Sequence, residues 1–215
     1  MVSVADAVIP VSWYIISEFN NNNSFDYSIN DITYNYIIPD GNYTVTELQE
    51  ILIDNVPFTI SYNSINNKFT FSHSTDEFIL LSTSTCFELI GFTENVNHSS
   101  TSQTLICDNQ IDLAGTRNIY ICTNLQTLNM DSRVGTVSSH ILTKIPVNVN
   151  NNNLITYYNY NGFRSLLRNK LINNIRIRIE DDKGNLININ NHYSISIELH
   201  VIPDKLLIFS NQLTS

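Results

Sequence analysis

The chain has 215 residues, a mass of 24.5 kDa and 42% hydrophobic residues, which is enough for one domain with a sizeable core. Its formal net charge of -9 at pH 7 repels the phosphate backbone of nucleic acids, so we expect no direct nucleic-acid partner. No stretch approaches the roughly 20 apolar residues that cross a bilayer, and the start of the chain lacks the features of a signal peptide. We therefore expect no membrane span.

The first half of the chain alternates apolar with polar residues at the period of two that is typical of strands. We expect strands over residues 4–16, 29–38 and 78–81. A hairpin is predicted around residues 64–67, because apolar residues alternate on both sides of it. Its Asn66-Asn67 pair suits the left-handed backbone of a tight turn.

One short helix interrupts this pattern near residues 44–54. Thr44 and Glu47 have the spacing of a capping box, in which each side chain satisfies a backbone N–H of the first turn. Four apolar residues then share one helical face: Val45, Leu48, Ile51 and Leu52. The spacing predicts an amphipathic helix that covers an edge or one end of a sheet.

The second half returns to strand patterns. We expect strands over residues 118–123, 141–149 and 154–160. Near the end, residues 175–179 and 193–201 both alternate, and a turn at residues 181–185 separates them, so we interpret them as a C-terminal hairpin or meander. Many strands joined by polar turns predict a β-sandwich or a barrel.

The sequence contains no motif of the common enzyme classes: no GxSxG elbow, Walker loop, GxGxxG turn or HExxH helix. Ser139 and His140 are adjacent, but neighbours on a strand point to opposite faces. The Asp181-Asp182 pair precedes Lys183-Gly184 and is typical of a turn. The three cysteines have no metal or disulfide spacing, so we expect reduced core thiols. We therefore predict no catalytic residue, no metal and no cofactor.

Six residues are candidates for an interface. Arg164, Arg168, Arg176 and Arg178 form a basic concentration in an acidic chain, either as a solvated face or as a contact with an acidic neighbouring subunit. Trp13 and Tyr158 are the aromatic candidates. In a β-rich chain such aromatic residues mainly pack in the core, and when exposed they bind a partner or a sugar.

Six segments, taken in order between about residue 5 and residue 202, resemble the penton and minor capsid proteins of virophages, Polinton-like viruses and nucleocytoplasmic large DNA viruses. These segments are residues 7–14, 38–44, 66–71, 112–121, 141–146 and 175–182. None of them is a specific motif by itself, and it is their shared order that carries the resemblance.

Together with the strand pattern, the resemblance implies an all-β fold: a single jelly-roll β-sandwich over residues 1–205, followed by a tail or terminal strand at residues 206–215. It implies a non-enzymatic structural protein of an icosahedral DNA-virus capsid, either a penton or another minor capsid protein, assembled inside the infected host cell. The implied partners are copies of itself in a pentamer, the double jelly-roll major capsid protein and other minor capsid proteins.

Two alternatives stay open at this point. The first is a carbohydrate-binding jelly-roll module of a virion spike or of a secreted protein, which would use Trp13 or Tyr158. The second is a hydrolase on a β-sandwich, which would need convergent carboxylates or a Ser/His pair that the sequence does not show at a recognisable spacing.

Overall fold

The computed structural model describes residues 1–127, 140–168 and 172–201, and the backbone of residues 131–133 and 136–138. Its contacts divide the chain into two compact units, which we call unit 1 (residues 1–13 and 116–215) and unit 2 (residues 14–115). Unit 2 is therefore an insertion in the sequence of unit 1. The single domain of residues 1–205 stays a prediction, and the tail at residues 206–215 lies outside the described residues.

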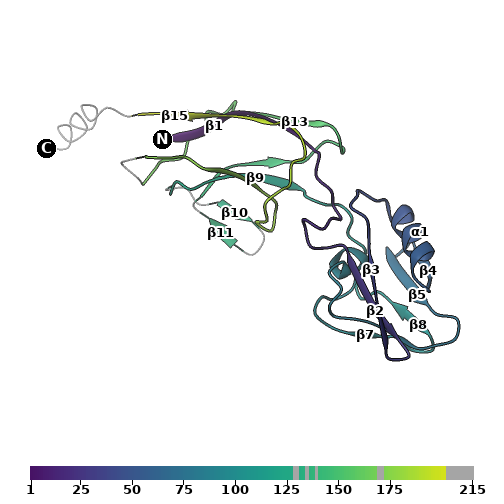
Figure 1. Ribbon diagram of the computed structural model, residues 1–215. Helices are drawn as coiled ribbons and strands as arrows, with labels where there is room; N and C mark the ends of the chain where they lie inside the picture. Colours follow the sequence, from purple (N-terminus) through teal and green to yellow (C-terminus); the bar gives the residue numbers. More distant parts are fainter. Residues whose placement is uncertain (128–130, 134–135, 139, 169–171, 202–215) are drawn as a thin grey trace. The chain divides into compact units, whose positions relative to one another are not determined.

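Unit 1 is a sandwich of two three-stranded sheets, with strand orders β13-β1-β15 and β12-β9-β14, and a separate hairpin β10-β11 (Figure 1). All strand pairs are antiparallel. The strands are β1 Val2–Pro10, β9 Asn118–Thr123, β10 Asp131–Arg133, β11 Thr136–Ser138, β12 Ile141–Pro146, β13 Leu154–Tyr158, β14 Ile177–Glu180 and β15 Ser194–Leu199. Alternate residues of both sheets, such as Ile9 and Ile121, point into one aliphatic core.

From β12 onward, successive strands of unit 1 alternate between its two sheets. The chain passes from β12 in one sheet to β13 in the other, returns to β14 and crosses again to β15. Such crossings are typical of jelly-roll sandwiches. The predicted C-terminal hairpin is therefore wrong: the turn after β14 reverses the chain, but the return is limited to a bridge between Glu180 and Leu186. Alternation identifies the buried face of a strand but does not identify its sheet.

Unit 2 also contains two sheets, with orders β3-β2-β6-β7 and β4-β5-β8, and both helices (Figure 1). Its elements are β2 Ser24–Ile29, β3 Ile32–Ile37, α1 Val45–Asn55, β4 Thr59–Asn63, β5 Lys68–Ser72, β6 Phe78–Leu80, α2 Phe87–Ile90, β7 His98–Ser99 and β8 Thr104–Ile106. Both sheets and both helices contribute to one aromatic core. At its centre, the rings of Phe25 and Phe71 stack with their centroids 5.8 Å apart.

Helix α1 forms as its sequence predicts. The Thr44 hydroxyl accepts the backbone N–H of Glu47 at 3.3 Å, and the Glu47 carboxylate accepts the backbone N–H of Thr44 at 2.8 Å. Leu48 and Leu52 are buried in the core of unit 2. The Gln49 side chain donates to the Ile60 carbonyl at 2.9 Å, which ties the helix to β4.

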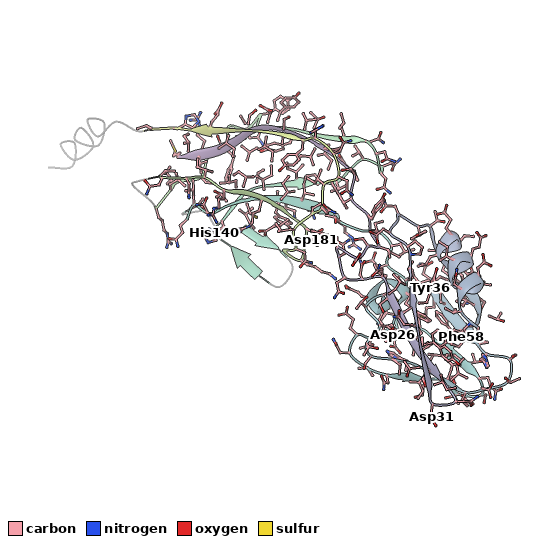
Figure 2. All side chains as sticks on the ribbon, in the orientation of Figure 1. Asp26, Asp31, Tyr36, Phe58, His140 and Asp181 are labelled. Atoms are coloured by element: carbon pink, nitrogen blue, oxygen red, sulfur yellow. The ribbon has the colours of Figure 1, made fainter. Side chains whose placement is uncertain are left out.

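The predicted all-β class with one short amphipathic helix is confirmed, as is the hairpin of β4 and β5. The strand expected over residues 29–38 is instead the turn and second strand of a hairpin, because Asn30 and Asp31 adopt φ of 51° and 63° (Figure 2). Within the described residues, neither helix is long and apolar enough to cross a membrane.

Candidate interaction surface

The six candidate interface residues lie in three different settings in unit 1. Trp13 is 7% exposed and packs in the aliphatic core, so its ring is not presented to a ligand. Arg176 and Arg178 lie at β14, on the sheet with β9. Tyr158, Arg164 and Arg168 lie on the single segment that runs from the end of β13, and all three are exposed.

Arg178 has an evident role inside unit 1. Its Nε lies 2.7 Å from the Glu180 carboxylate, which is 6% exposed, while the Arg178 side chain itself is 47% exposed. The Cys122 thiol also donates to Glu180, at 3.5 Å. A buried carboxylate needs such partners because its desolvation is costly. Arg178 thus pairs with a carboxylate of its own strand. Arg176 is exposed, and among the described residues its hydrogen bonds are those of its backbone with Asn124.

The backbone of residues 158–168 is held firmly against the rest of unit 1. Asn159 donates its backbone N–H to the Ala5 carbonyl at 2.9 Å, and Ser165 and Val2 exchange two backbone hydrogen bonds of 2.8 and 2.9 Å. The Asn159 side chain closes the loop between these anchors, accepting the N–H of Phe163 at 2.9 Å and donating to its carbonyl at 2.8 Å. A loop fixed in this way presents its side chains at little further cost in conformational entropy.

The side chains on this segment are large, apolar and exposed. Tyr158 is 52% exposed, Tyr160 88%, Phe163 53% and Leu166 45%. The two tyrosine rings lie 5.6 Å apart at an angle of 46°. We call these four residues, with Arg164 and Arg168, the 158–168 surface. Aromatic residues and arginine are enriched where protein interfaces are buried, and carboxylates, which this segment lacks, are depleted there.

Charge is divided very unequally between the two units. Unit 2 contains thirteen Asp and Glu residues against one lysine, a formal charge of -12. Unit 1 contains seven acidic and ten basic residues, a formal charge of +3, and together these give the total of -9. The arginines that stand out in the sequence therefore belong to unit 1, whose formal charge is positive, whereas the formal charge of unit 2 is negative.

A second exposed feature lies in unit 2, where β3 is an edge strand of its sheet. Three of its apolar side chains are exposed: Ile32 by 57%, Tyr34 by 42% and Ile37 by 52%. Tyr34 stacks on Tyr27 of β2, with ring centroids 5.2 Å apart. An edge strand with exposed apolar residues is open to pairing, but its two faces alternate, and no group on it indicates a particular partner.

The residues that were considered as catalytic or metal-binding candidates have structural partners. Asp181 accepts the backbone N–H groups of Lys183 and Asn185 within its turn (Figure 2), and Asp182 accepts those of Arg117 and Asn118. His140 contacts the Leu125 carbonyl at 3.2 Å, and Ser139 lies outside the described residues. In the part of the chain that the structure describes, no three His, Cys, Asp or Glu side chains are grouped to hold a metal ion.

The three cysteines are buried, reduced thiols, as predicted. Burial raises the pKa of Cys86 far above its ordinary value, and burial raises the pKa of Cys107 to about 12. The Cys107 thiol donates to the Ile90 carbonyl at 3.0 Å in the core of unit 2. A thiol is a poor nucleophile while it stays protonated, so Cys86 and Cys107 serve as small core side chains.

No protein-family model matches this chain, and no curated protein sequence matches it. Among solved structures, it is similar to the crystal structure of the selenomethionine-labelled mavirus penton protein, with a TM-score of 0.44 and 11% sequence identity. The match covers 91% of this chain and 86% of that chain.

Sequence reasoning selected three of the six residues of the 158–168 surface as interface candidates, Tyr158, Arg164 and Arg168, and did not select Tyr160, Phe163 and Leu166. In the structure β13 ends at Tyr158, before the end of the strand expected over residues 154–160, and the next residues form a loop around Gly162, whose φ is 61°. A usable signal was present: a stretch of aromatic residues and arginines without a single carboxylate, directly after a strand.

Proposed function

We propose that this chain is a structural protein of an icosahedral capsid, a penton or another minor capsid protein, which works through its subunit interfaces and not as an enzyme. The observation that carries the proposal is the 158–168 surface, where four large apolar side chains and two arginines are exposed on a firmly anchored loop. The order of the segments that resemble capsid proteins supports it independently.

Removal of apolar side chains from water favours an interface at this surface. An exposed apolar side chain gains roughly 1.5–3 kcal/mol when it is fully removed from water, so a cluster of four favours association strongly. Single exposed apolar residues are normal on protein surfaces, but neighbouring ones on a rigid loop mark contact sites. Arginine adds directional hydrogen bonds without the tight hydration of lysine.

A capsid role also implies a particular arrangement of copies and partners. We propose that copies of the chain form a pentamer at a vertex, beside the double jelly-roll major capsid protein and other minor capsid proteins, in virions assembled inside the infected cell. Cyclic rings of this kind use two different surfaces of each subunit, so that each copy contacts its neighbours in a head-to-tail manner.

The first test is the mass of the purified chain in solution, measured by light scattering from low to high micromolar concentration. We expect the mass to rise with concentration from the 24.5 kDa monomer towards a pentamer. A chain that stays monomeric throughout the series and does not co-purify with particles contradicts the proposal.

A pair of variants with matched exposure tests the surface itself. Phe163→Ser removes an apolar ring from the 158–168 surface, whereas Leu186→Ser removes a side chain of equal exposure, 53%, elsewhere in unit 1. We expect Phe163→Ser to weaken self-association about tenfold and Leu186→Ser to leave it nearly unchanged. Equal effects of the two changes would show that association does not use this surface.

The carbohydrate-binding alternative retains one of its two aromatic candidates, because Tyr158 is exposed and Trp13 is buried. The tilted pair of Tyr158 and Tyr160 offers faces on which a sugar ring can stack. Binding in a glycan array that is lost in Tyr160→Ala would favour this alternative over the capsid proposal.

A further inference from the structure

We propose that the 158–168 surface of one copy docks on the exposed face of helix α1 in a second copy, with Arg164 and Arg168 against the carboxylates of that helix. The inference rests on the proposed function and extends it, because it names the partner surface in the neighbouring chain. The contact joins unit 1 of one copy to unit 2 of the next.

Helix α1 presents an acidic stripe that includes one apolar residue. Glu47, Glu50, Ile53 and Asp54 are all exposed, and they recur at the three- and four-residue spacing that places them on one helical face. Ile53 is 41% exposed. The opposite face carries the buried Leu48 and Leu52, and the helix contains no lysine or arginine.

The two surfaces complement each other in residue type. The 158–168 surface has arginines beside aromatic and aliphatic side chains, and α1 has carboxylates beside an isoleucine. Among the ion pairs of the described residues, none involves Arg164, Arg168, Glu50 or Asp54. These groups are therefore available to a partner, and arginine forms paired hydrogen bonds with a carboxylate.

The charge of the whole units favours this choice of partner. Two copies of unit 2, each with a formal charge of -12, repel one another, whereas unit 1 carries a formal charge of +3. Contacts between unlike units are thus favoured over contacts between like units. A contact between two different surfaces is also the kind that repeats around a closed ring.

Charge reversal in the full-length chain tests the pairing, with self-association measured by sedimentation velocity. We expect Arg164→Glu alone and Glu50→Lys alone each to raise the dissociation constant about tenfold or more. The combined variant R164E/E50K restores the opposite charges in exchanged positions. We expect its dissociation constant to return to within about threefold of the wild-type value.

Two further changes act as matched controls. Arg176→Glu makes the same change of charge at an exposed position of unit 1, and Glu94→Lys does so at an exposed position of unit 2. Neither lies on the proposed contact, so we expect the dissociation constant to stay within about twofold of wild type in both. The fluorescence of Trp13 and the circular dichroism of each variant report whether the fold is retained.

The possible outcomes distinguish the proposed pairing from the proposed function. Loss of association in both single variants, with recovery in the combined one, supports the pairing. An oligomer that responds equally to Arg164→Glu and Arg176→Glu, or a combined variant weaker than either single one, overturns the pairing and leaves the proposed function standing. A wild-type chain that never self-associates overturns both.

Discussion

The two units use the same strand pattern to build chemically different cores. In unit 1 the buried residues of the aliphatic core are mostly valine and isoleucine, and Trp13 is the one aromatic residue among them. In unit 2 seven phenylalanines fill the corresponding space: Phe25, Phe58, Phe69, Phe71, Phe78, Phe87 and Phe92. The comparison teaches that alternation determines which positions are buried, while the kind of apolar residue there is free to differ between units.

The surfaces differ as much as the cores. Unit 2 holds thirteen of the chain's twenty carboxylates and only one of its eleven lysines and arginines. Such a concentration of one sign keeps a unit hydrated and discourages contact between its copies. Unit 1 combines a nearly balanced charge with the 158–168 surface, so it is the unit suited to contact a partner.

Removing one ring from the aromatic core should have the largest effect. Phe71 is fully buried and contacts four rings: Phe25, Phe58, Phe69 and Phe92. We expect Phe71→Ala to lower the free energy of unfolding of unit 2 by about 3–5 kcal/mol, because it loses burial and leaves a cavity. Urea unfolding followed by far-ultraviolet circular dichroism measures the loss.

The same variant tests whether the two cores unfold together. Trp13, the only tryptophan, lies in the core of unit 1, so its fluorescence reports that unit alone. Because the two cores share no residue, we expect the fluorescence transition to keep its midpoint in Phe71→Ala. A joint shift of both signals would instead support the single cooperative domain that the sequence predicts for residues 1–205.

A change at the helix cap should have a smaller effect on unit 2. Thr44→Ala removes the hydroxyl that accepts the Glu47 N–H at the start of α1. We expect the free energy of unfolding to fall by about 1 kcal/mol, the usual cost of losing such a cap. Thr44→Ser keeps the hydroxyl and should stay near wild type in the same urea experiment. Equal losses in both would mean that packing of the threonine methyl group, and not the cap, matters here.

Local patterns in the sequence predicted what depends on neighbouring residues. The capping box located α1, and alternation located the hairpin of β4 and β5 and the inward faces of β14 and β15. Each of these signals acts over a few residues, through hydrogen bonds of the first helical turn or the pleat of one strand. These signals can therefore be recognised in the sequence without knowledge of the partner strands.

The features that were missed depend on distant parts of the chain or on unusual turn residues. No local signal shows that β14 and β15 belong to opposite sheets, because both point isoleucines into one core. The turn at Asn30-Asp31 lacks the glycine that marks such turns, so the predicted strand ran through it from residue 29, and β2 was not predicted. The surface at residues 158–168 depends on anchors to Val2 and Ala5, far away in sequence.

The smallest effect we predict concerns a strained turn of unit 2. Ser102 and Gln103 adopt φ of 53° and 57° between β7 and β8, which is costly for residues with a side chain. The Glu77 carboxylate supports this turn by accepting the Ser100 hydroxyl and the Gln103 backbone N–H. These hydrogen bonds, that from Ser100 first, hold the pKa of Glu77 below its ordinary value of 4.5.

A lowered pKa stabilises the folded state at pH values above the ordinary one, and this stabilisation is lost as the pH falls through the folded-state value. We therefore expect Glu77→Gln to melt at a lower temperature than wild type at pH 7, and the gap to close as the pH falls well below 4.5. Circular dichroism melts across this range measure the gap. Glu94→Gln makes the same change of charge on an exposed loop of the same unit and is the control for charge alone. If both variants behave alike, general repulsion within the acidic unit explains the effect, and Glu77 has no special part in holding the turn.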